Sequence, residues 1–256
     1  MTMAAPGAQP EGARDEHGAA TAVREMFDTI APRYDLLNHV LSVNIDRLWW
    51  WRTARRFRAI LARPDAAVLD ICCGTGDMTL ALLRRRPAKA RPILAADFSH
   101  QMLRRGAAKF GPRGGARLRN GGAEAIEADA LHLPLAAASL DLVVSAFGFR
   151  NLANYQAGLE EFHRALKPGG EVGILDFNEP GGLLGKLYSL YFHHVLPAIG
   201  AVISGVSGPY TYLPTSVQRF PPPPEMLEIM KRAGFRDVSW TPYSLGIAGL
   251  YRGVKS

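Results

Sequence analysis

Residues 68–76 constrain the fold of this chain more than any other segment. They read Val-Leu-Asp-Ile-Cys-Cys-Gly-Thr-Gly, an apolar strand that runs into a glycine turn. A lone acid, Asp97, follows about twenty residues later, after a second apolar run. Gly74 and Gly76 let the backbone turn tightly and approach a ligand, and an acid ending the next strand can accept both hydroxyls of an adenosine ribose. The segment therefore predicts an α/β sheet that binds a nucleotide-like ligand.

The composition of the turn selects among nucleotide-like ligands. A dinucleotide fingerprint has a third glycine where helix and strand pack closely, and this chain has Thr79 there. Asp70 and Asp77 flank the turn, which suits a cationic ligand with an amino group better than a diphosphate. We therefore predict S-adenosylmethionine as the cofactor, and an ordinary strand-to-helix turn is the alternative.

Strand and helix patterns alternate along the chain as in a parallel sheet. The predicted strands are 68–71, 93–96, a short strand ending at 129, 142–147, 172–177, 238–243 and 247–254. The predicted helices are 77–85, 99–109, 155–166 and 225–233, with a tight turn at 167–170. Seven strands in this order predict a doubly wound, mostly parallel sheet.

The composition is that of one globular domain. The chain has 256 residues, of which 48% are hydrophobic and 21% charged. The first twenty residues contain no apolar stretch typical of a signal peptide, so we predict a disordered tail at 1–20, a single domain at 21–256 and a cytoplasmic location.

Cys72 and Cys73 are neighbours that would form a strained ring if they were bridged by a disulfide. We interpret them as reduced cysteines that pack at the turn.

The net charge of +7 is concentrated in two arginine groups. They comprise Arg47, Arg52, Arg55, Arg56, Arg58 and Arg63, and then Arg84, Arg85 and Arg86. Trp49, Trp50 and Trp51 lie within the first group, a mixture found both in single-strand nucleic-acid sites and in helices at a membrane surface. A plain solvated helix face is the third alternative.

Ligands bind outside the carboxyl ends of the strands in sheets of this kind. We therefore expect one pocket formed by Gly74, Thr75, Gly76, Asp97, Phe98, Asp129, Ala130 and 145–151. Asp129 and Ala130 would contact the adenine edge, and Phe98 would pack on its face or belong to the core.

Four motifs then resemble the ubiquinone and menaquinone biosynthesis C-methyltransferases, over residues 23–255. They are Phe27-Asp28-x-Ile30-Ala31-x-x-Tyr34-Asp35, Leu69-Asp70-x-Cys72-Cys73-Gly74-Thr75-Gly76-Asp77, Phe147-Gly148-Phe149-Arg150-Asn151 and Leu166-Lys167-Pro168-Gly169-Gly170. The Cys-Cys-Gly-Thr form and the stretch Leu175-Asp176-Phe177-Asn178 look more like the naphthoquinone branch than the ubiquinone branch. The resemblance implies the class I S-adenosylmethionine-dependent methyltransferase fold with an inserted apolar helical cap, from helices near 21–62 and an insertion near 180–220.

The resemblance also implies the activity, which is C-methylation of a prenylated quinol, with demethylmenaquinol favoured over the ubiquinone-branch quinol. It places cofactor contacts on Thr75, Asp97, Asp129 and Ala130, and the residue pattern adds Asp70, Gly74, Gly76 and Phe98. Many members have Asn where this chain has Asp129, and Ser or Gly where it has Ala146, and neither change removes the ribose acid. No metal is predicted.

The resemblance points to Arg150 and Asn151 as the catalytic residues. Family proposals make Arg150 a base acting through a water, but a guanidinium is a poor proton acceptor, so we predict that it stabilises the substrate oxyanion. Asn151 would orient the quinol oxygen or the arginine, and the proton would leave to water or to His39, Asp35, His193 or His194.

Two interpretations from other classes are weaker. A nucleic-acid methyltransferase would account for the charge, but the chain lacks an Asn-Pro-Pro-Tyr amine site and a Pro-Cys nucleophile. A noncatalytic scaffold subunit would not need the Arg150-Asn151 pair.

The stretch 183–206 is apolar, but Lys186, His193, His194 and Pro197 interrupt it, so it does not predict a membrane span. We predict that it forms a roof over the isoprenoid tail and contacts the inner face of the membrane. A helix pair in the core is the alternative.

Overall fold

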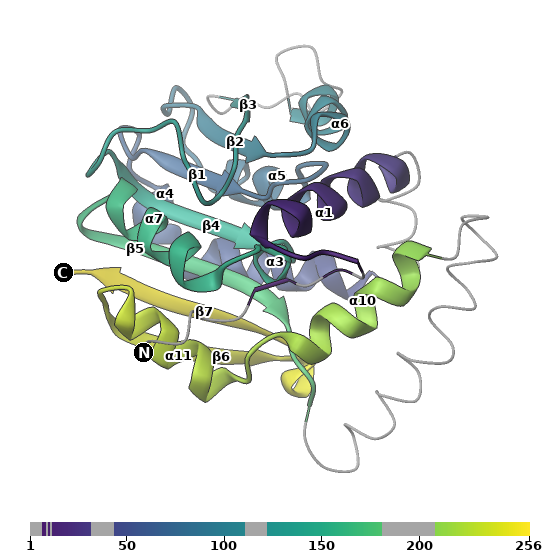
Figure 1. The fold of residues 1–256 in the computed structure, drawn as a ribbon. Coiled ribbons are helices and arrows are strands. Elements are labelled where there is room, and N and C mark those ends of the chain that lie inside the picture. Colours follow the sequence, from purple (N-terminus) through teal and green to yellow (C-terminus); the bar gives the residue numbers. More distant parts are fainter. Residues whose placement is uncertain (1–6, 9, 11, 32–43, 111–121, 181–207) are drawn as a thin grey trace.

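The computed structural model describes residues 7–8, 10, 12–31, 44–110, 122–180 and 208–256. Seven strands form one sheet in the order β3-β2-β1-β4-β5-β7-β6 (Figure 1). The strands are β1 (Val68–Ile71), β2 (Ile93–Asp97), β3 (Ala123–Glu127), β4 (Leu140–Ala146), β5 (Leu166–Phe177), β6 (Phe235–Tyr243) and β7 (Ala248–Lys255). The predicted strand count and class of sheet are confirmed.

The first five strands are parallel, and β7 runs antiparallel between β5 and β6. The chain moves outward from β1 to β2 and β3, and then returns to place β4 on the other side of β1. This reversal of strand order creates a crevice at the carboxyl ends of β1 and β4, where ligands bind in open α/β sheets.

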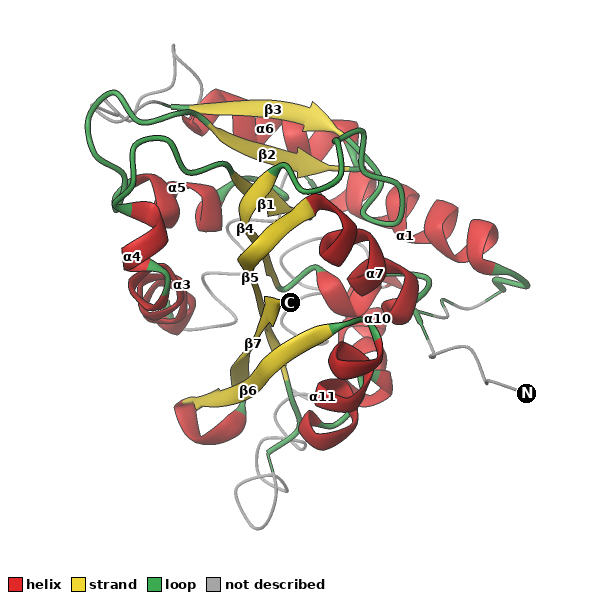
Figure 2. Ribbon diagram, turned by 90° about the vertical axis from the view of Figure 1, so that its left-hand side faces the viewer, coloured by secondary structure: helices red, strands yellow, loops and turns green. Residues whose placement is uncertain are grey.

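Helices cover both faces of the sheet (Figure 2). One face packs against α3 (Ile45–Arg56), α4 (Arg58–Leu61), α5 (Asp77–Leu83) and α6 (His100–Phe110), and the other against α7 (Tyr155–Ala165) and α11 (Pro223–Arg232). Two further helices, α1 (Glu16–Ile30) and α10 (Gly208–Arg219), lie at the end of the sheet where the parallel strands finish (Figure 1). The two apolar cores are the reason that β1 and β4 are buried on both faces.

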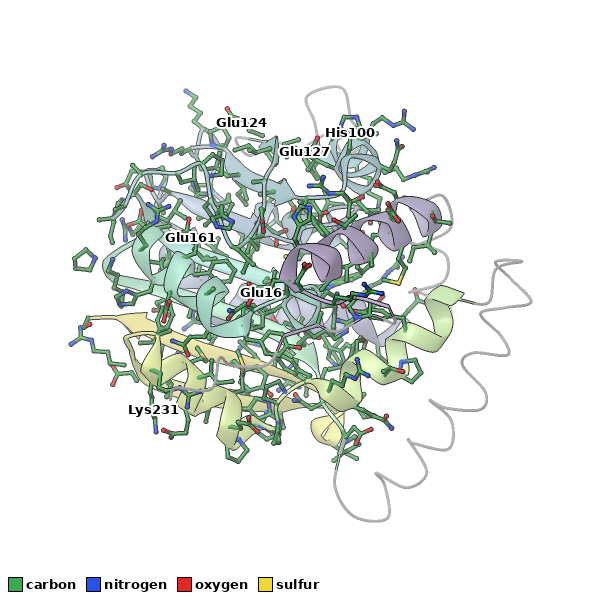
Figure 3. The ribbon with its side chains drawn as sticks, viewed as in Figure 1. Glu16, His100, Glu124, Glu127, Glu161 and Lys231 are labelled. Atoms are coloured by element: carbon green, nitrogen blue, oxygen red, sulfur yellow. The ribbon has the colours of Figure 1, made fainter. Side chains whose placement is uncertain are left out.

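The edge strand β3 carries charge rather than an apolar surface. Glu124 and Glu127 on this strand are exposed, and the His100 ring of α6 lies 3.0 Å from the Glu127 carboxylate (Figure 3). Charged side chains on an edge strand discourage pairing with another sheet. The sheet therefore ends at β3, and the chain turns back toward Asp129.

Several predicted boundaries differ from the structure by a few residues, and the largest differences are at the starts of α1 and β5. Helix α1 begins at Glu16, inside the predicted tail, because the Asp15 carboxylate caps it by accepting a 2.7 Å hydrogen bond from Gly18 N–H. Strand β5 begins at Leu166, which pairs with Leu140, so the predicted turn at 167–170 is an irregularity within the β4–β5 pairing. Gly169 permits this irregularity at φ +77°.

Candidate active site

The glycine turn and Asp97 form one hydrogen-bonded unit. The carboxylate of Asp97 accepts 2.8 Å and 2.9 Å hydrogen bonds from the main-chain N–H groups of Gly74 and Ser99. Gly76 then caps α5 at φ +85°, and a Cβ there would lie 2.4 Å from the Phe110 ring. The glycines are thus needed for both the turn and the packing of α6 against it, and the turn fixes the Asp97 carboxylate.

Two buried carboxylates beneath the turn lack a cationic partner among the described residues. Burial raises the pKa of Asp70 to about 7, although Thr79 donates a 2.5 Å hydrogen bond to one of its oxygens. Burial also raises the pKa of Asp97 to about 6, although the hydrogen bonds from Ser99 N–H and Gly74 N–H stabilise the charged form and lower this pKa. A cation bound near these carboxylates would favour their charged forms, so the site suits a positively charged ligand.

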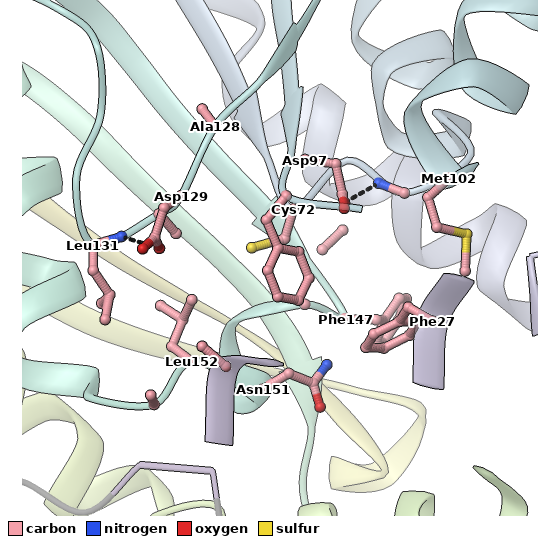
Figure 4. A pocket seen from close by; sticks show the side chains of 17 residues that line it. Phe27, Cys72, Asp97, Met102, Ala128, Asp129, Leu131, Phe147, Asn151 and Leu152 are labelled. Carbon is pink, nitrogen blue, oxygen red and sulfur yellow. Dashed lines mark hydrogen bonds between the residues drawn. The ribbon is translucent and has the colours of Figure 1, made fainter. Parts of the chain in front are cut away.

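A cavity of about 680 Å³, including its opening to solvent, lies at the carboxyl ends of β1, β2 and β4 (Figure 4). Six predicted site residues line it: Gly74, Asp97, Phe98, Asp129, Ala130 and Asn151. The rest of the lining is Ala20, Phe27, Cys72, Met102, Ala128, Leu131, Ala146, Phe147, Gly148, Leu152 and Ala153. The site is therefore an apolar chamber with few polar side chains, which suits an aromatic ligand.

Four predicted site residues do not line this cavity. Asp70 is buried on β1, Thr75 is a buried residue of the turn itself, and Gly76 packs against α6. Arg150 is buried behind the cavity wall. Their predicted contacts with cofactor or substrate remain predictions. Among the described residues, no group of His, Cys, Asp and Glu side chains could hold a metal ion.

Helix α1 supplies a wall of the cavity, and it overlaps the segment 21–62 that the sequence assigned to a cap, although no residue of α1 was predicted to line the site. Ala20 and Phe27 of α1 line the cavity, and the guanidinium of Arg24 lies 5.5 Å from the centre of the Phe98 ring. The neighbouring Asp28 accepts a 2.5 Å hydrogen bond from the Ser99 hydroxyl. The Phe27-Asp28 motif was the signal that could have placed α1 at the site.

The loops after β1 and β4 touch directly at the base of the cavity. A Cβ on Gly148 would lie 2.3 Å from the Cys72 Cβ. Cys72 and Phe147, on either side of this contact, have left-handed backbones with φ of +55° and +57°. Cys72 and Cys73 are both free thiols, and burial raises the pKa of each. The raised pKa values agree with the prediction that both cysteines are packing residues rather than nucleophiles.

Arg150 is held by an ion pair rather than exposed to the chamber. Its Nη1 lies 2.8 Å from an Asp176 carboxylate oxygen and donates to the Phe147 carbonyl. Its main-chain N–H donates to the other Asp176 oxygen at 3.0 Å. The Asp176 side chain is fully buried, so the pair anchors the short helix η1 (Phe149–Asn151) to β5. The negative charge of Asp176 therefore compensates the positive charge of Arg150 within the protein.

The strand order, the glycine turn after β1 and the acid that ends β2 are those of the class I S-adenosylmethionine-dependent methyltransferase fold. The cofactor fits the residues present, because Asp97 lines the cavity without a cationic partner among the described residues, and a carboxylate there can accept hydroxyl groups and favours a positively charged ligand. The family model described as the ubiE/COQ5 methyltransferase family matches residues 14–255. The chain therefore belongs to this family and is an S-adenosylmethionine-dependent methyltransferase.

Curated relatives match over nearly their whole length. A demethylmenaquinone methyltransferase from Deinococcus radiodurans is 45% identical, covering 99% of this chain and 100% of the relative. One of the same name from Thermus thermophilus is 41% identical, over 89% and 99% of the two chains. A ubiquinone/menaquinone biosynthesis C-methyltransferase from Syntrophotalea carbinolica is also 41% identical, over 91% and 94%.

Solved structures share the fold at low sequence identity. An S-adenosylmethionine-dependent methyltransferase from Thermotoga maritima superposes with a TM-score of 0.60 at 18% identity, over 91% of this chain and 99% of its own. The [4+2]-cyclase SpnF superposes with a TM-score of 0.63 at 17% identity, over 98% of both chains. Because a cyclase shares the fold, activity has to be argued from the site.

Proposed function

We propose that this methyltransferase C-methylates the ring of a prenylated naphthoquinol and converts demethylmenaquinol to menaquinol. The observation that carries the proposal is the apolar chamber, which has the ribose carboxylate of Asp97 on one wall and the Asn151 amide on another. This arrangement leaves an apolar space for an aromatic ring beside the cofactor. The names of the relatives from Deinococcus radiodurans and Thermus thermophilus support the naphthoquinol over the ubiquinone-branch quinol.

The chemistry is alkylation of a ring carbon, and S-adenosylmethionine supplies the electrophilic methyl group. A ring carbon is nucleophilic once a neighbouring hydroxyl loses its proton, so the protein must align the ring, exclude water and stabilise the oxyanion. Phe27, Phe147, Leu131 and Leu152 provide the dry walls. We assign to Asn151 the donation of a hydrogen bond to the ring oxygen, because it lines the chamber and its side-chain nitrogen has no partner among the described residues.

Two parts of this mechanism remain predictions. Arg150 lies behind the wall beside Asp176, so direct contact with the oxyanion needs a rotation of its side chain away from the ion pair. The candidate proton acceptors Asp35, His39, His193 and His194 lie outside the described residues. The predicted roof at 183–206 lies outside them too.

Mass spectrometry of membrane quinones tests the proposed reaction. In cells that lack this protein, we expect an unmethylated naphthoquinone to accumulate, and the wild-type chain to restore its methylated form. The Asp97→Ala variant, expressed at the same level, serves as the control without cofactor binding. Accumulation of an unmethylated benzoquinone would assign the chain to the ubiquinone branch, and unchanged quinones would contradict both assignments.

We also propose that α3 rests on an anionic lipid surface, where the long-tailed substrate resides. Ile45, Leu48 and Trp51 of α3 are 42%, 50% and 45% exposed. Because they are three residues apart, they lie within an arc of about 120° around the helix axis and form one ridge. The guanidinium groups of Arg55 and Arg85 lie 5.2 Å and 5.6 Å from the centre of the Trp51 ring. An apolar ridge with adjoining arginines is typical of a helix that lies in a membrane interface.

Not every predicted surface arginine takes part in this face. Arg86 is buried, and its guanidinium donates to five main-chain carbonyls: Leu61, Arg63, Pro64, Ala66 and Arg91. It therefore holds loops together rather than attracting lipid. Within the described part of the chain, no helix is long and apolar enough to cross a bilayer.

Sedimentation with lipid vesicles tests the surface contact. We expect binding to vesicles containing phosphatidylglycerol but little to pure phosphatidylcholine, and a loss of at least about tenfold for Leu48→Ser with Trp51→Ser. Leu245→Ser is the control, because Leu245 is 81% exposed on the turn η3 (Ser244–Gly246) outside α3. Equal losses for the control and the α3 variant, or binding that ignores lipid charge, would contradict this contact.

A further inference from the structure

Helix α10 holds two neighbouring residues of the candidate site. The Tyr212 hydroxyl donates a 3.2 Å hydrogen bond to the Asn151 side-chain oxygen. The Ser216 hydroxyl, one helical turn further along α10, lies 3.4 Å from Arg150 Nε, which donates to it. Residues four apart lie on the same face of a helix. One face of α10 therefore supports both Arg150 and Asn151 from behind the chamber.

The Asn151 amide presents its two ends to different surroundings. Its oxygen accepts from Tyr212, whereas its nitrogen has no hydrogen-bond partner among the described residues. Asn151 is only 8% exposed, and it lines the chamber. Figure 4 shows the amide nitrogen on the side of Phe147 and the oxygen turned away from it. A buried donor without a partner is costly, which fits a ligand oxygen as its missing acceptor.

We propose that Tyr212 is a positioning residue that holds the Asn151 amide with its nitrogen, rather than its oxygen, toward the reacting ring oxygen. The inference rests on the proposed function, because it assigns that donor to the quinol oxygen. A flipped amide would present a carbonyl, which repels the negative charge that develops on the ring oxygen. The orientation therefore decides whether Asn151 stabilises or destabilises the transition state.

The Tyr212 hydroxyl is suited to this task because it stays protonated. Burial raises the pKa of Tyr212 to about 12, and the nearby Arg150 and Arg219 oppose this shift only in part. A neutral tyrosine hydroxyl can donate one hydrogen bond and can also accept one. With a flipped amide the hydroxyl could accept from the Asn151 nitrogen, but its own proton would then have no acceptor among the described residues. The hydroxyl thus favours the amide orientation in which Asn151 Oδ1 faces α10.

A double-mutant cycle in steady-state methylation of a soluble demethylmenaquinol analogue tests the inference. We expect Tyr212→Phe to lower kcat about tenfold while the Kd for S-adenosylmethionine changes by less than about twofold. In the Asn151→Ala background, Tyr212→Phe should have no further effect on kcat. The matched control is Tyr251→Phe, which removes a buried hydroxyl that also pairs with an amide, Asn178 Nδ2 at 2.6 Å, away from the chamber. This control should keep the wild-type kcat.

Nuclear magnetic resonance of side-chain amides in protein with ¹⁵N-labelled asparagine gives a readout that does not require turnover. The Asn151 amide signals are identified by their loss in Asn151→Ala, and we expect Tyr212→Phe to shift them and Tyr251→Phe to leave them in place. Additive losses of kcat in the cycle, or unchanged Asn151 signals in Tyr212→Phe, would overturn the inference. If the wild-type protein does not methylate the quinol but the signals shift, the proposed substrate fails and the positioning role stands.

Discussion

The Ser99 hydroxyl donates a 2.5 Å hydrogen bond to the Asp28 carboxylate, which joins α1 to the turn that carries Asp97. The same carboxylate oxygen lies 3.4 Å from the main-chain nitrogen of Gln101 at the start of α6. Because Ser99 N–H also donates to Asp97, α1 is joined to a residue that fixes the Asp97 carboxylate.

We expect Asp28→Ala to weaken S-adenosylmethionine binding about tenfold, because α1 loses its bonds to Ser99 and Gln101. Calorimetric titration measures the affinity, and amide hydrogen exchange measures the opening of α1. Asp28→Asn is the control, since it keeps an acceptor oxygen, and it should stay within about threefold of wild type. Unchanged exchange in α1 for Asp28→Ala would show that the contact does not hold the helix.

Asp97→Ala should remove most of the cofactor affinity and leave the fold intact. Loss of a carboxylate that accepts both ribose hydroxyls costs about 2 to 4 kcal/mol, or roughly 30-fold to nearly 1,000-fold in Kd. Asp129→Ala serves as the comparison, because its carboxylate lines the same chamber but is exposed. An unchanged dissociation constant for Asp97→Ala in calorimetry would remove Asp97 from the site.

The buried carboxylates should give opposite pH trends for stability and binding. Burial raises the pKa of Asp97 to about 6 and of Asp70 to about 7, from a reference of 3.8. The folded protein therefore holds protons that the unfolded chain releases, so the ligand-free protein should gain stability as the pH falls from about 7 to about 4. S-adenosylmethionine prefers charged carboxylates, so its affinity should fall over the same range.

Urea unfolding and calorimetry at several pH values check both trends. Asp97→Asn, which cannot titrate, should flatten the part of the stability curve near pH 6 and move the part near pH 7 to lower pH, because the charge of Asp97 helps to raise the pKa of Asp70. A curve for Asp97→Asn with the wild-type slope would mean that Asp97 does not titrate in this range.

Removing the negative charge of Asp176 from its ion pair with Arg150 should destabilise the protein. Asp176→Asn removes the carboxylate that pairs with the buried guanidinium, and breaking a buried ion pair by removing one partner typically costs about 3 to 5 kcal/mol in the free energy of unfolding. Adding Arg150→Met to Asp176→Asn removes the guanidinium as well, and the double variant should regain most of the lost stability. Denaturant unfolding measures both, and equal stability of wild type and Asp176→Asn would contradict the ion pair.

The role of Arg150 in turnover is tested separately. If Arg150 stabilises the oxyanion, Arg150→Lys should retain partial activity with a shifted pH profile, because the charge survives without the fork geometry. The stable Arg150→Met with Asp176→Asn variant should then remain at least about 100-fold less active than wild type. Recovered activity in that double variant would show that Arg150 only anchors η1.

The sequence predicted the sheet and the position of Asp97 at the end of β2 because both depend on local patterns. Buried apolar runs such as Val68–Ile71 lead into glycine turns, and the spacing to Asp97 places the acid at the next strand end. The orientation of Arg150 was not predictable in this way, because it is set by Asp176, a residue 26 positions later on another element. Asp70 and Thr75 are close in sequence to residues that line the cavity but do not line it themselves, since burial around β1 and its turn is a tertiary property.

The start of α1 was missed for a related reason. Ala-rich and Gly-rich residues with mixed charge predict disorder, yet Ala8 N–H donates a 2.7 Å hydrogen bond to the Leu152 carbonyl, and Asn154 donates to Glu16. These long-range contacts hold the segment against the end of the sheet, and composition alone carries no information about them.

The contact between Gly148 and Cys72 links the two halves of the chamber mechanically. With a Cβ excluded at residue 148, there is no spare space through which the loop after β1 could shift without moving the loop after β4. A molecule that displaces Cys72 on one side therefore displaces the segment carrying Asn151 on the other. If the cofactor moves Cys72 on binding, cofactor and acceptor share one coupling free energy, and each then changes the affinity for the other by the same factor.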